Sequence, residues 1–219
     1  MAAPVESRTY RRQECAVFRK TDERFGGLSN MAPGYPLCVN GVPVWTAEAI
    51  YQACRFPHLP DVQRLIIDQT SPMTAKMRSK PYRQQSRLDW DDVRVQVMRW
   101  CLRAKLVQNW EKFRSLLLAT GEGEQPIVED SRRDDFWGAV APKDDPQTLV
   151  GRNVLGRLLM ELRERVRNSS PEDWRAVLPP KIPDFLLFGQ PIGPVLKSDS
   201  DSSMRHTRQP SFTTFEAHT

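Results

Sequence analysis

The alternation of apolar and polar positions divides the chain into a short beginning rich in strands and a longer helical middle. The stretch CAVFRK predicts a first strand, and two apolar runs around Asn40-Gly41 predict a β-hairpin, because Asn-Gly suits a two-residue hairpin turn. Between them, ERFGGLSNMAPGYP has the glycine, serine, asparagine and proline content of a loop. The predicted strands therefore lie near the start of the chain.

After Trp45 the apolar positions recur at helical spacing. Thr46 is placed to cap a helix over TAEAIYQACRF, and DVQRLIIDQ and PMTAKMRSK predict two further short helices. Longer helices are predicted for EKFRSLLLAT, for NVLGRLLMELRERV and, most clearly, for DWDDVRVQVMRWCLRAKLVQNW, and a last one begins near residue 170. The clearest of these places one apolar stripe at Val93, Val97, Cys101, Ala104 and Val107. The pattern predicts an α+β fold that is predominantly helical, with a small N-terminal sheet or hairpin.

The two ends of the chain have few apolar positions. We expect residues 1–11 to form a flexible N-terminus, residues 12–180 to form one folded domain, and residues 181–219 to form a Pro-rich extension and a disordered tail. A length of 219 residues is ample for a single core. The apolar content of 39% is slightly low, and a disordered segment would explain it.

Composition and charge narrow the classes of function. No apolar run approaches the ~18 residues of a membrane span, and the start of the chain lacks the apolar centre of a signal peptide, so a cytoplasmic protein is expected. The four scattered cysteines form no C-x-x-C pair, which favours buried thiols over a zinc or redox site. The net charge of +5 favours an anionic ligand such as a phosphate, or a weak nucleic-acid contact, but no basic run is dense enough to favour polyanion binding.

Carboxylates are better candidate catalysts than histidines in this chain. His206 and His218 lie in the predicted tail, and His58, among prolines, suits a turn or surface position. A Ser-His-Asp triad or a multi-histidine metal site therefore lacks its parts. The glycine-rich segments match neither an ATP phosphate loop nor a dinucleotide fingerprint. We accordingly expect no metal, no cofactor, and proton transfer by carboxylates.

The segment IVEDSRRDDFWGA, residues 127–139, sets carboxylates directly against a tryptophan. One interpretation is structural: Ile127 and Val128 end a strand, the charges form a solvated loop, and Phe136 and Trp137 return to the core. The other is chemical, because a carboxyl beside an aromatic wall can move a proton next to a stacked ring. The pattern alone leaves both interpretations open.

Six motifs, in this order, resemble the NADAR family of YbiA-like N-glycosidases. They are GGLSNMAPG (26–34), WTAEAIYQACRF (45–56), SPMTAKM (71–77), DWDDVRVQVMRWCLRAKLVQN (89–109), IVEDSRRDDFWGA (127–139) and GRNVLGRLLMELR (151–163). The resemblance spans residues 15–166. It implies hydrolysis of an N-glycosidic bond, either in phosphorylated ribosylamino-pyrimidine intermediates of riboflavin synthesis or between ADP-ribose and guanine in DNA.

The resemblance also implies roles for individual residues. The family's glutamate falls on Glu48, its tryptophan before the long helix on Trp90, and its acid and ring on Asp134 and Trp137. Asp135 is adjacent, but the spacing to the ring favours Asp134. In this scheme the two carboxylates are catalytic, and the two tryptophans sandwich the base. Many relatives have a histidine directly after the glutamate, whereas this chain has an alanine, which leaves substrate choice open.

Four further residues are candidates to hold phosphate or ribose hydroxyls, namely Ser29, Asn30, Lys76 and Asn153. A capping or solvated role suits each of them equally well. The expected protein is a metal-independent N-glycoside hydrolase whose partner is a small phosphorylated nucleotide-like substrate or ADP-ribosylated guanine in DNA. The alternatives are a catalytically silent module that binds ADP-ribose or a related nucleotide, and nucleic-acid binding without chemistry.

Overall fold

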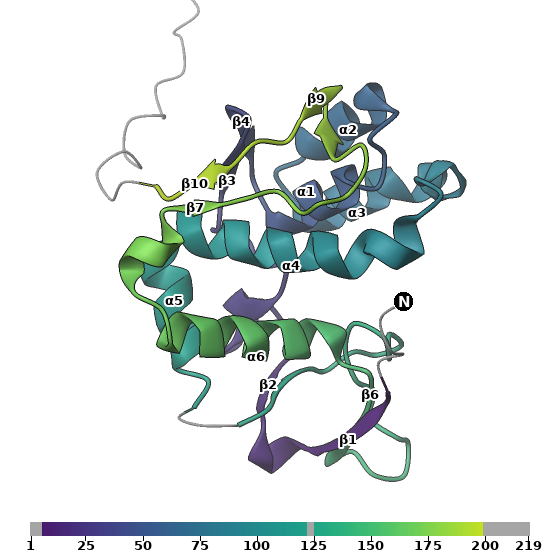
Figure 1. Cartoon of the computed structure of the whole chain (residues 1–219). Coiled ribbons are helices and arrows are strands. Elements are labelled where there is room, and N and C mark those ends of the chain that lie inside the picture. The colour runs from purple at the N-terminus through teal and green to yellow at the C-terminus, as the bar shows by residue number, and fades with distance from the viewer. Residues whose placement is uncertain (1–5, 122–124, 199–219) are drawn as a thin grey trace, which may run out of the picture.

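Helix α4 (Trp90–Gln108) is the central element of the computed structural model, which describes residues 6–121 and 125–198. It contacts α1, α5 and α6 and the short strands near the end of the chain (Figure 1). The stripe predicted from the sequence is buried, and so are residues on other sides of the helix, including Trp100 and Leu102. A helix buried on several sides lies within a core rather than on its surface.

Three short helices pack against one another on one side of α4, namely α1 (Ala47–Ala53), α2 (Pro60–Ile67) and α3 (Pro72–Ser79). Local sequence explains where each begins. Thr46 accepts a hydrogen bond from the Ala49 N–H at the start of α1, and a proline occupies the first turn of both α2 and α3. The predicted short helices are thus confirmed.

Helices α5 (Trp110–Leu118) and α6 (Val154–Arg167) pack against α4 and against each other (Figure 1). Within the described residues, four 3-10 segments complete the helical part: η1 (Arg12–Glu14), η2 (Gly26–Leu28), η3 (Lys80–Gln85) and η4 (Pro171–Trp174). The helix predicted to begin near residue 170 is therefore only the single turn η4, after which the chain becomes extended.

The strands form two-stranded pairs rather than one continuous sheet. Their bounds are β1 (Arg8–Arg11), β2 (Ala16–Phe18), β3 (Leu37–Val39), β4 (Val42–Val44), β5 (Ile127–Glu129), β6 (Thr148–Gly151), β7 (Ala176–Val177), β8 (Leu186–Leu187), β9 (Gln190–Pro191) and β10 (Val195–Leu196). The predicted hairpin is confirmed as the antiparallel pair β3–β4, with positive φ at Asn40 and Gly41. The pairs β1–β6, β7–β10 and β8–β9 are also antiparallel, whereas β2–β5 is parallel. The α+β class is confirmed, although strands also occur in the second half of the chain.

The structure corrects both predicted chain ends. Within the predicted flexible segment 1–11, Arg8–Arg11 pairs with β6. Within the predicted extension 181–219, residues 181–198 pack against the core. Prolines shorten the strands there but do not prevent burial of the apolar side chains. Those buried side chains are Ile182, Phe185, Leu187, Ile192 and Val195. The rest of the predicted tail lies outside the described residues.

Two further expectations concern the cysteines and the membrane. Cys54 and Cys101 are buried thiols as predicted, whereas Cys15 is partly buried and Cys38 is exposed. Cys38 faces outward because it occupies the middle position of β3, between two buried neighbours. Within the described part of the chain, no helix has the length and apolar character needed to span a membrane.

Candidate active site

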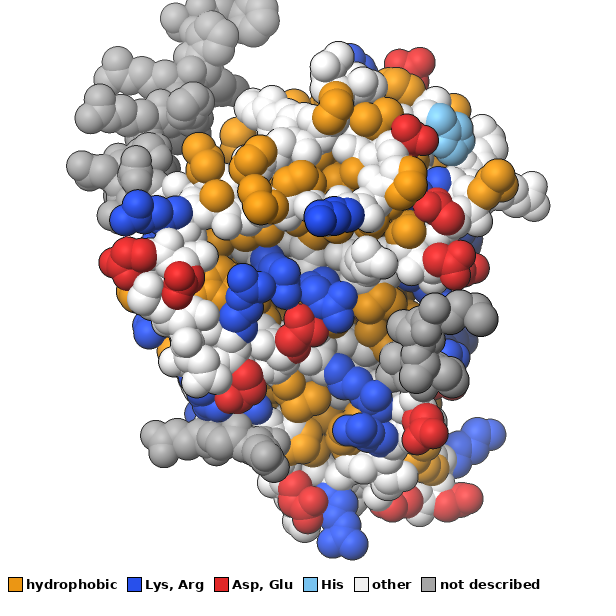
Figure 2. Space-filling view, viewed as in Figure 1, with side chains coloured by type: hydrophobic (Ala, Val, Ile, Leu, Met, Phe, Trp, Pro, Cys, Tyr) orange, Lys and Arg blue, Asp and Glu red, His pale blue; other side chains and the backbone are white. Residues whose placement is uncertain are grey.

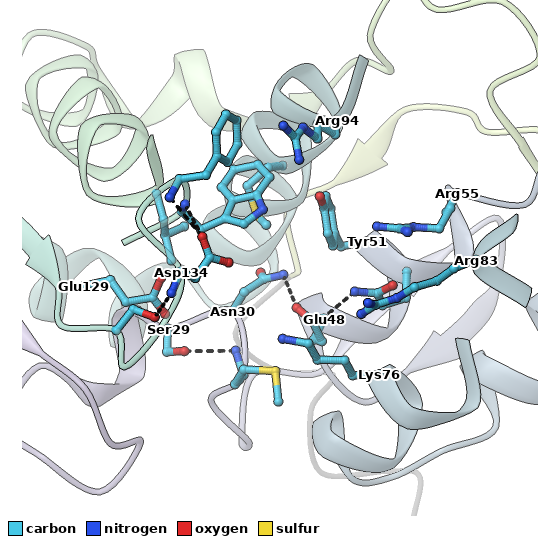
Figure 3. A pocket seen from close by; sticks show the side chains of 17 residues that line it. Ser29, Asn30, Glu48, Tyr51, Arg55, Lys76, Arg83, Arg94, Glu129 and Asp134 are labelled. Atoms are coloured by element: carbon cyan, nitrogen blue, oxygen red, sulfur yellow. Dashed lines mark hydrogen bonds between the residues drawn. The ribbon is translucent and has the colours of Figure 1, made fainter. Parts of the chain in front are cut away.

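A pocket of about 370 Å³ lies between helices α1 and α3 on one side and the segment after β5 on the other (Figure 3). The Gly-rich loop around η2 and the first half of α4 complete its walls. It combines three kinds of side chain: the carboxylates Glu48, Glu129 and Asp134, the cations Arg55, Lys76, Arg83 and Arg94, and the rings Tyr51, Phe136 and Trp137. Such a lining suits a ligand that has both a flat ring and a negative charge.

Helix α1 supplies one face of this pocket. Tyr51 and Gln52 follow Glu48 by three and four positions, which places them on its side of the helix, and Arg55 follows just after the helix ends. The interval between Glu48 and Gln52 also allows a hydrogen bond within the helix, from the Gln52 Nε2 to the Glu48 Oε1 at 2.8 Å. Helix α1 and the turn that follows it therefore bring an acid, an amide, a ring and a cation together.

The Glu48 carboxylate is only 5% exposed and is held at both oxygens. Asn30 Nδ2 donates to Oε2 at 3.1 Å, opposite the bond from Gln52, and the Ser79 Oγ donates in turn to Gln52 Oε1 at 3.0 Å. Burial raises the pKa of Glu48, while Lys76 and the two amide donors oppose the rise. The network fixes both the orientation of the carboxylate and the side of it that faces the pocket.

A buried lysine positions the Gly-rich loop that carries Asn30. The Lys105 side chain is fully buried in α4, and its Nζ donates to the carbonyls of Gly27 at 2.6 Å and Ser29 at 2.9 Å. The same Nζ lies 4.3 Å from the centroid of the Tyr35 ring. The sequence analysis missed Lys105, although its place directly after Ala104 on the buried stripe was a signal.

The predicted candidates Ser29 and Lys76 both line the pocket, but in different ways. The Ser29 Oγ accepts the Met31 N–H at 3.1 Å, which is a local capping bond. Lys76 extends from α3 and is exposed. Its positive charge is close enough to Glu48 and Glu129 to oppose the rise in the pKa of each.

Asp134 caps the turn that presents Trp137. Its Oδ1 accepts the N–H of Phe136 at 3.0 Å and that of Trp137 at 2.8 Å, and its own N–H donates to the Ser131 Oγ. This local hydrogen bonding explains why the acid precedes the ring by three positions. The exposed Asp135 does not line the pocket. Each interpretation of segment 127–139 is therefore right for part of it: Val128 is buried in the core, whereas Asp134 and Trp137 line the pocket.

Glu129 is a pocket carboxyl that the sequence analysis missed. It is the last residue of β5 and lines the pocket together with Glu48 and Asp134. Burial raises the pKa of Glu129 to about 7, and the charges of Asp134 and Glu48 add to the rise. The signal in the sequence was its position directly after the buried pair Ile127 and Val128, at the point where the strand leaves the core.

Trp90 does not line the pocket, so it cannot sandwich a base there together with Trp137. The ring of Tyr51 packs against both Trp90, with centroids 5.2 Å apart, and Trp137, with centroids 5.8 Å apart. Trp90 is 6% exposed, does not line the pocket, and carries the guanidinium of Arg55 over its ring at 4.7 Å. The structure therefore places Trp90 behind Tyr51 and Arg55, and Trp137 on the pocket itself.

Asn153 is also placed away from the pocket. Its side chain is fully buried at the start of α6, where the backbone has a φ of 49°. The Nδ2 donates to the carbonyl of Ile127 at 2.8 Å, and the Oδ1 accepts the N–H of Glu129 at 3.2 Å. Both polar groups of its side chain thus join β5 to α6, and Asn153 does not line the pocket.

A second group of cations lies outside the pocket, on the face that α4 and α6 present in Figure 2. Arg99 and Arg103 of α4 pair with Glu161 of α6 at 3.0 and 3.2 Å. Arg165 lies over the ring of Trp174 at 5.1 Å. These arginines therefore have partners within the fold. In the described ranges, no group of three histidine, cysteine or acidic side chains is arranged to hold a metal ion.

Comparisons with known proteins agree with this architecture. The NADAR domain model matches residues 17–167. N-glycosidase YbiA of Escherichia coli (strain K12) is 36% identical over 152 residues, which cover 68% of this chain and 86% of that protein. The riboflavin biosynthesis protein VVA0006 of Vibrio vulnificus (strain YJ016) is 34% identical over 177 residues, which are 78% of this chain and only 45% of that protein.

The fold is shared as well as the sequence. The NMR structure of E. coli YbiA matches with a TM-score of 0.57 and 34% sequence identity, covering 69% of this chain and 83% of that one. The matched residues contain the whole pocket, from the Gly-rich loop to the start of α6. The resemblance found in the six motifs is therefore confirmed, and the chain belongs to the NADAR domain family.

Proposed function

We propose that this chain is an N-glycosidase that hydrolyses the bond between a ribosyl carbon and a nitrogen in a nucleotide-like substrate. The observation that carries the proposal is Glu48, a buried carboxylate held at both oxygens inside a pocket whose wall includes Trp137. The names of two relatives, N-glycosidase YbiA and N-glycosidase Npun_R5314, support the same class of reaction.

Breaking a ribosyl C–N bond builds positive charge on the sugar, so a nearby carboxylate stabilises the transition state and can deprotonate the attacking water. Asn30 and Gln52 favour the ionised form of Glu48 for this role, because a protonated carboxyl would set a hydrogen against one of these donors. Lys76 adds a favourable charge. We assign Glu48 to the sugar and the water.

The cations of the pocket favour a phosphorylated substrate. Arg55, Lys76 and Arg83 lie on the Glu48 side of the pocket (Figure 3). Trp137, whose N–H is held by Asp134, offers a face for a planar base. Both substrates implied by the family resemblance combine a ribosyl C–N bond, a phosphate and a planar base, namely a phosphorylated ribosylamino-pyrimidine of riboflavin synthesis and ADP-ribose attached to guanine in DNA. A relative named as a riboflavin biosynthesis protein supports the first.

The test is a product assay of the full chain against both substrates, with excess chelator present because we expect no metal. Wild-type protein should release either the free pyrimidine from the first substrate or free ADP-ribose from the second. Glu48→Gln should remain folded and bind substrate while turnover falls about 100-fold or more, the usual scale for general-base or charge-stabilising groups. Asp135→Asn is the matched control, since this exposed carboxylate lies outside the pocket, and its turnover should be unchanged.

The alternative function is a silent module that binds ADP-ribose or a related nucleotide. Binding alone makes no use of a carboxylate at position 48, so it predicts that Glu48→Gln retains its ligand affinity and that wild-type protein releases no product. Near-normal turnover in Glu48→Gln would also remove the hydrolytic role assigned to Glu48.

A further inference from the structure

The three carboxyls of the pocket differ in what holds them. Glu48 accepts from two side-chain amides, and the Asp134 Oδ1 accepts from two backbone N–H groups. Among the described residues, 6–121 and 125–198, none forms a hydrogen bond or an ion pair with the carboxyl of Glu129. Hydrogen bonds from donors stabilise an ionised carboxyl, so Glu129 is the one of the three that lacks this stabilisation.

Figure 3 shows how the three are distributed. Glu129 and Asp134 lie on one side of the pocket, and Glu48 lies across it beside Lys76 and Arg83. An N-glycoside bound between them would present its two ends to different carboxyls. Inverting and retaining glycosidases use two carboxyls in this way, one for the sugar and one for the leaving group.

We propose that Glu129 is the proton donor to the nitrogen of the leaving group, and that Asp134 is a positioning residue that holds the turn of Trp137. This assignment rests on the proposed N-glycosidase function and deepens it. A general acid must be protonated near the working pH, and a carboxyl kept neutral by burial and by like charges meets that requirement.

The environment of Glu129 meets this requirement for a carboxyl that stays protonated. Burial is the largest cause that raises its pKa to about 7, followed by the charges of Asp134 and Glu48, while Lys76 acts in the opposite direction. Asp134 has a different task, because its Oδ1 accepts the N–H groups of Phe136 and Trp137 and so holds the turn that presents the ring.

The backbone of Glu129 is fixed from three directions. Strand β5 pairs with β2, where Phe18 is its partner, and the Glu129 carbonyl accepts the Ala139 N–H at 2.9 Å. Its N–H donates to the buried Asn153. Asn153, expected from the sequence to contact substrate, instead positions the strand that ends in the proposed acid.

The proposed step balances as follows. The Glu129 carboxyl transfers its proton to the leaving nitrogen while the electron pair of the C–N bond moves to that nitrogen. Water adds to the ribosyl carbon and gives a proton to the Glu48 carboxylate, and exchange with solvent restores both groups. The products are the free sugar hydroxyl and the protonated amine or base.

The decisive experiment compares two N-ribosides with the same sugar phosphate, one with a neutral base and one with cationic nicotinamide, which leaves without a proton. Glu129→Gln should lower kcat on the neutral base by about 100-fold or more and on the nicotinamide compound by less than about 10-fold. In wild type, the protonated acid is the active form, so kcat/KM should fall as pH rises through about 7. Glu129→Gln should lack this fall.

Asp134→Asn is the matched variant, because asparagine retains an oxygen for the N–H groups of Phe136 and Trp137. It should keep the fall in rate near pH 7 and lose less activity than Glu129→Gln on the neutral base. A larger loss in Asp134→Asn, confined to the neutral base, would make Asp134 the acid. An equal loss of Glu129→Gln on both substrates would overturn the proposal and leave the N-glycosidase function intact. If wild type cleaves only one substrate, the pH profile decides; if it cleaves neither, the proposed function itself fails.

Discussion

Replacing Lys105 by methionine removes a buried ammonium while keeping a side chain of similar length. The carbonyls of Gly27 and Ser29 would each lose a donor, and a buried carbonyl left unpaired costs about 1–3 kcal/mol. The two together give about 2–6 kcal/mol, and relief from burying a charge offsets part of it. We therefore expect Lys105→Met to lower the free energy of unfolding by about 2–4 kcal/mol.

Equilibrium unfolding in urea measures this loss. Lys112→Met is the matched control, because Lys112 is exposed, donates to a single carbonyl, that of Gly34 at 3.0 Å, and lies 4.4 Å from the Tyr35 ring centroid. It should cost less than about 1 kcal/mol. The folded fraction of Lys105→Met should also turn over more slowly than wild type, because the loop that carries Asn30 is no longer held against α4. A loss of stability no larger than that of Lys112→Met would refute this account of Lys105.

Two further changes test the aromatic wall and the end of the fold. Trp137→Ala should lower kcat/KM by about 5- to 150-fold, which corresponds to about 1–3 kcal/mol of lost stacking, and should raise KM. An unchanged melting temperature is the control, and an unaltered KM would contradict a stacking role. Ending the chain after Pro180 removes the buried Ile182, Phe185 and Leu187 among others. Since each such side chain contributes about 1.5–3 kcal/mol to a total stability of about 5–15 kcal/mol, we expect calorimetry to show no cooperative unfolding; a transition like that of the full chain would contradict the packing described above.

The helical part of the fold was predictable because its signals are local. The stripe of α4, the cap at Thr46 and the turn at Asn40-Gly41 each depend on residues within a few positions of one another. The pairs β1–β6 and β7–β10 were not predictable. Their strands have two to four residues, too few for an alternating pattern, and β1 also lies far along the chain from its partner β6.

The site was predictable to the extent that it lies in motifs. The resemblance singled out Glu48, Asp134 and Trp137, and the structure brings all three to one pocket. It could not show that Tyr51 stands in front of Trp90, because burial behind another ring depends on packing between α1 and α4. The roles of Lys105 and Glu129 were hidden for the same reason, since burial of a charge is a property of the assembled core.

The parallel pair β2–β5 has a consequence for how the protein is made. Phe18 and Glu129 are partners although more than a hundred residues separate them, so the pair has to close a long loop at a cost in entropy. During synthesis, α1 leaves the ribosome with Glu48 long before β5 can deliver Glu129. A nascent chain that has released only α1 therefore holds Glu48 but not Glu129. The pocket is complete only when the non-local pair β2–β5 has formed, which is a slow kind of step in folding.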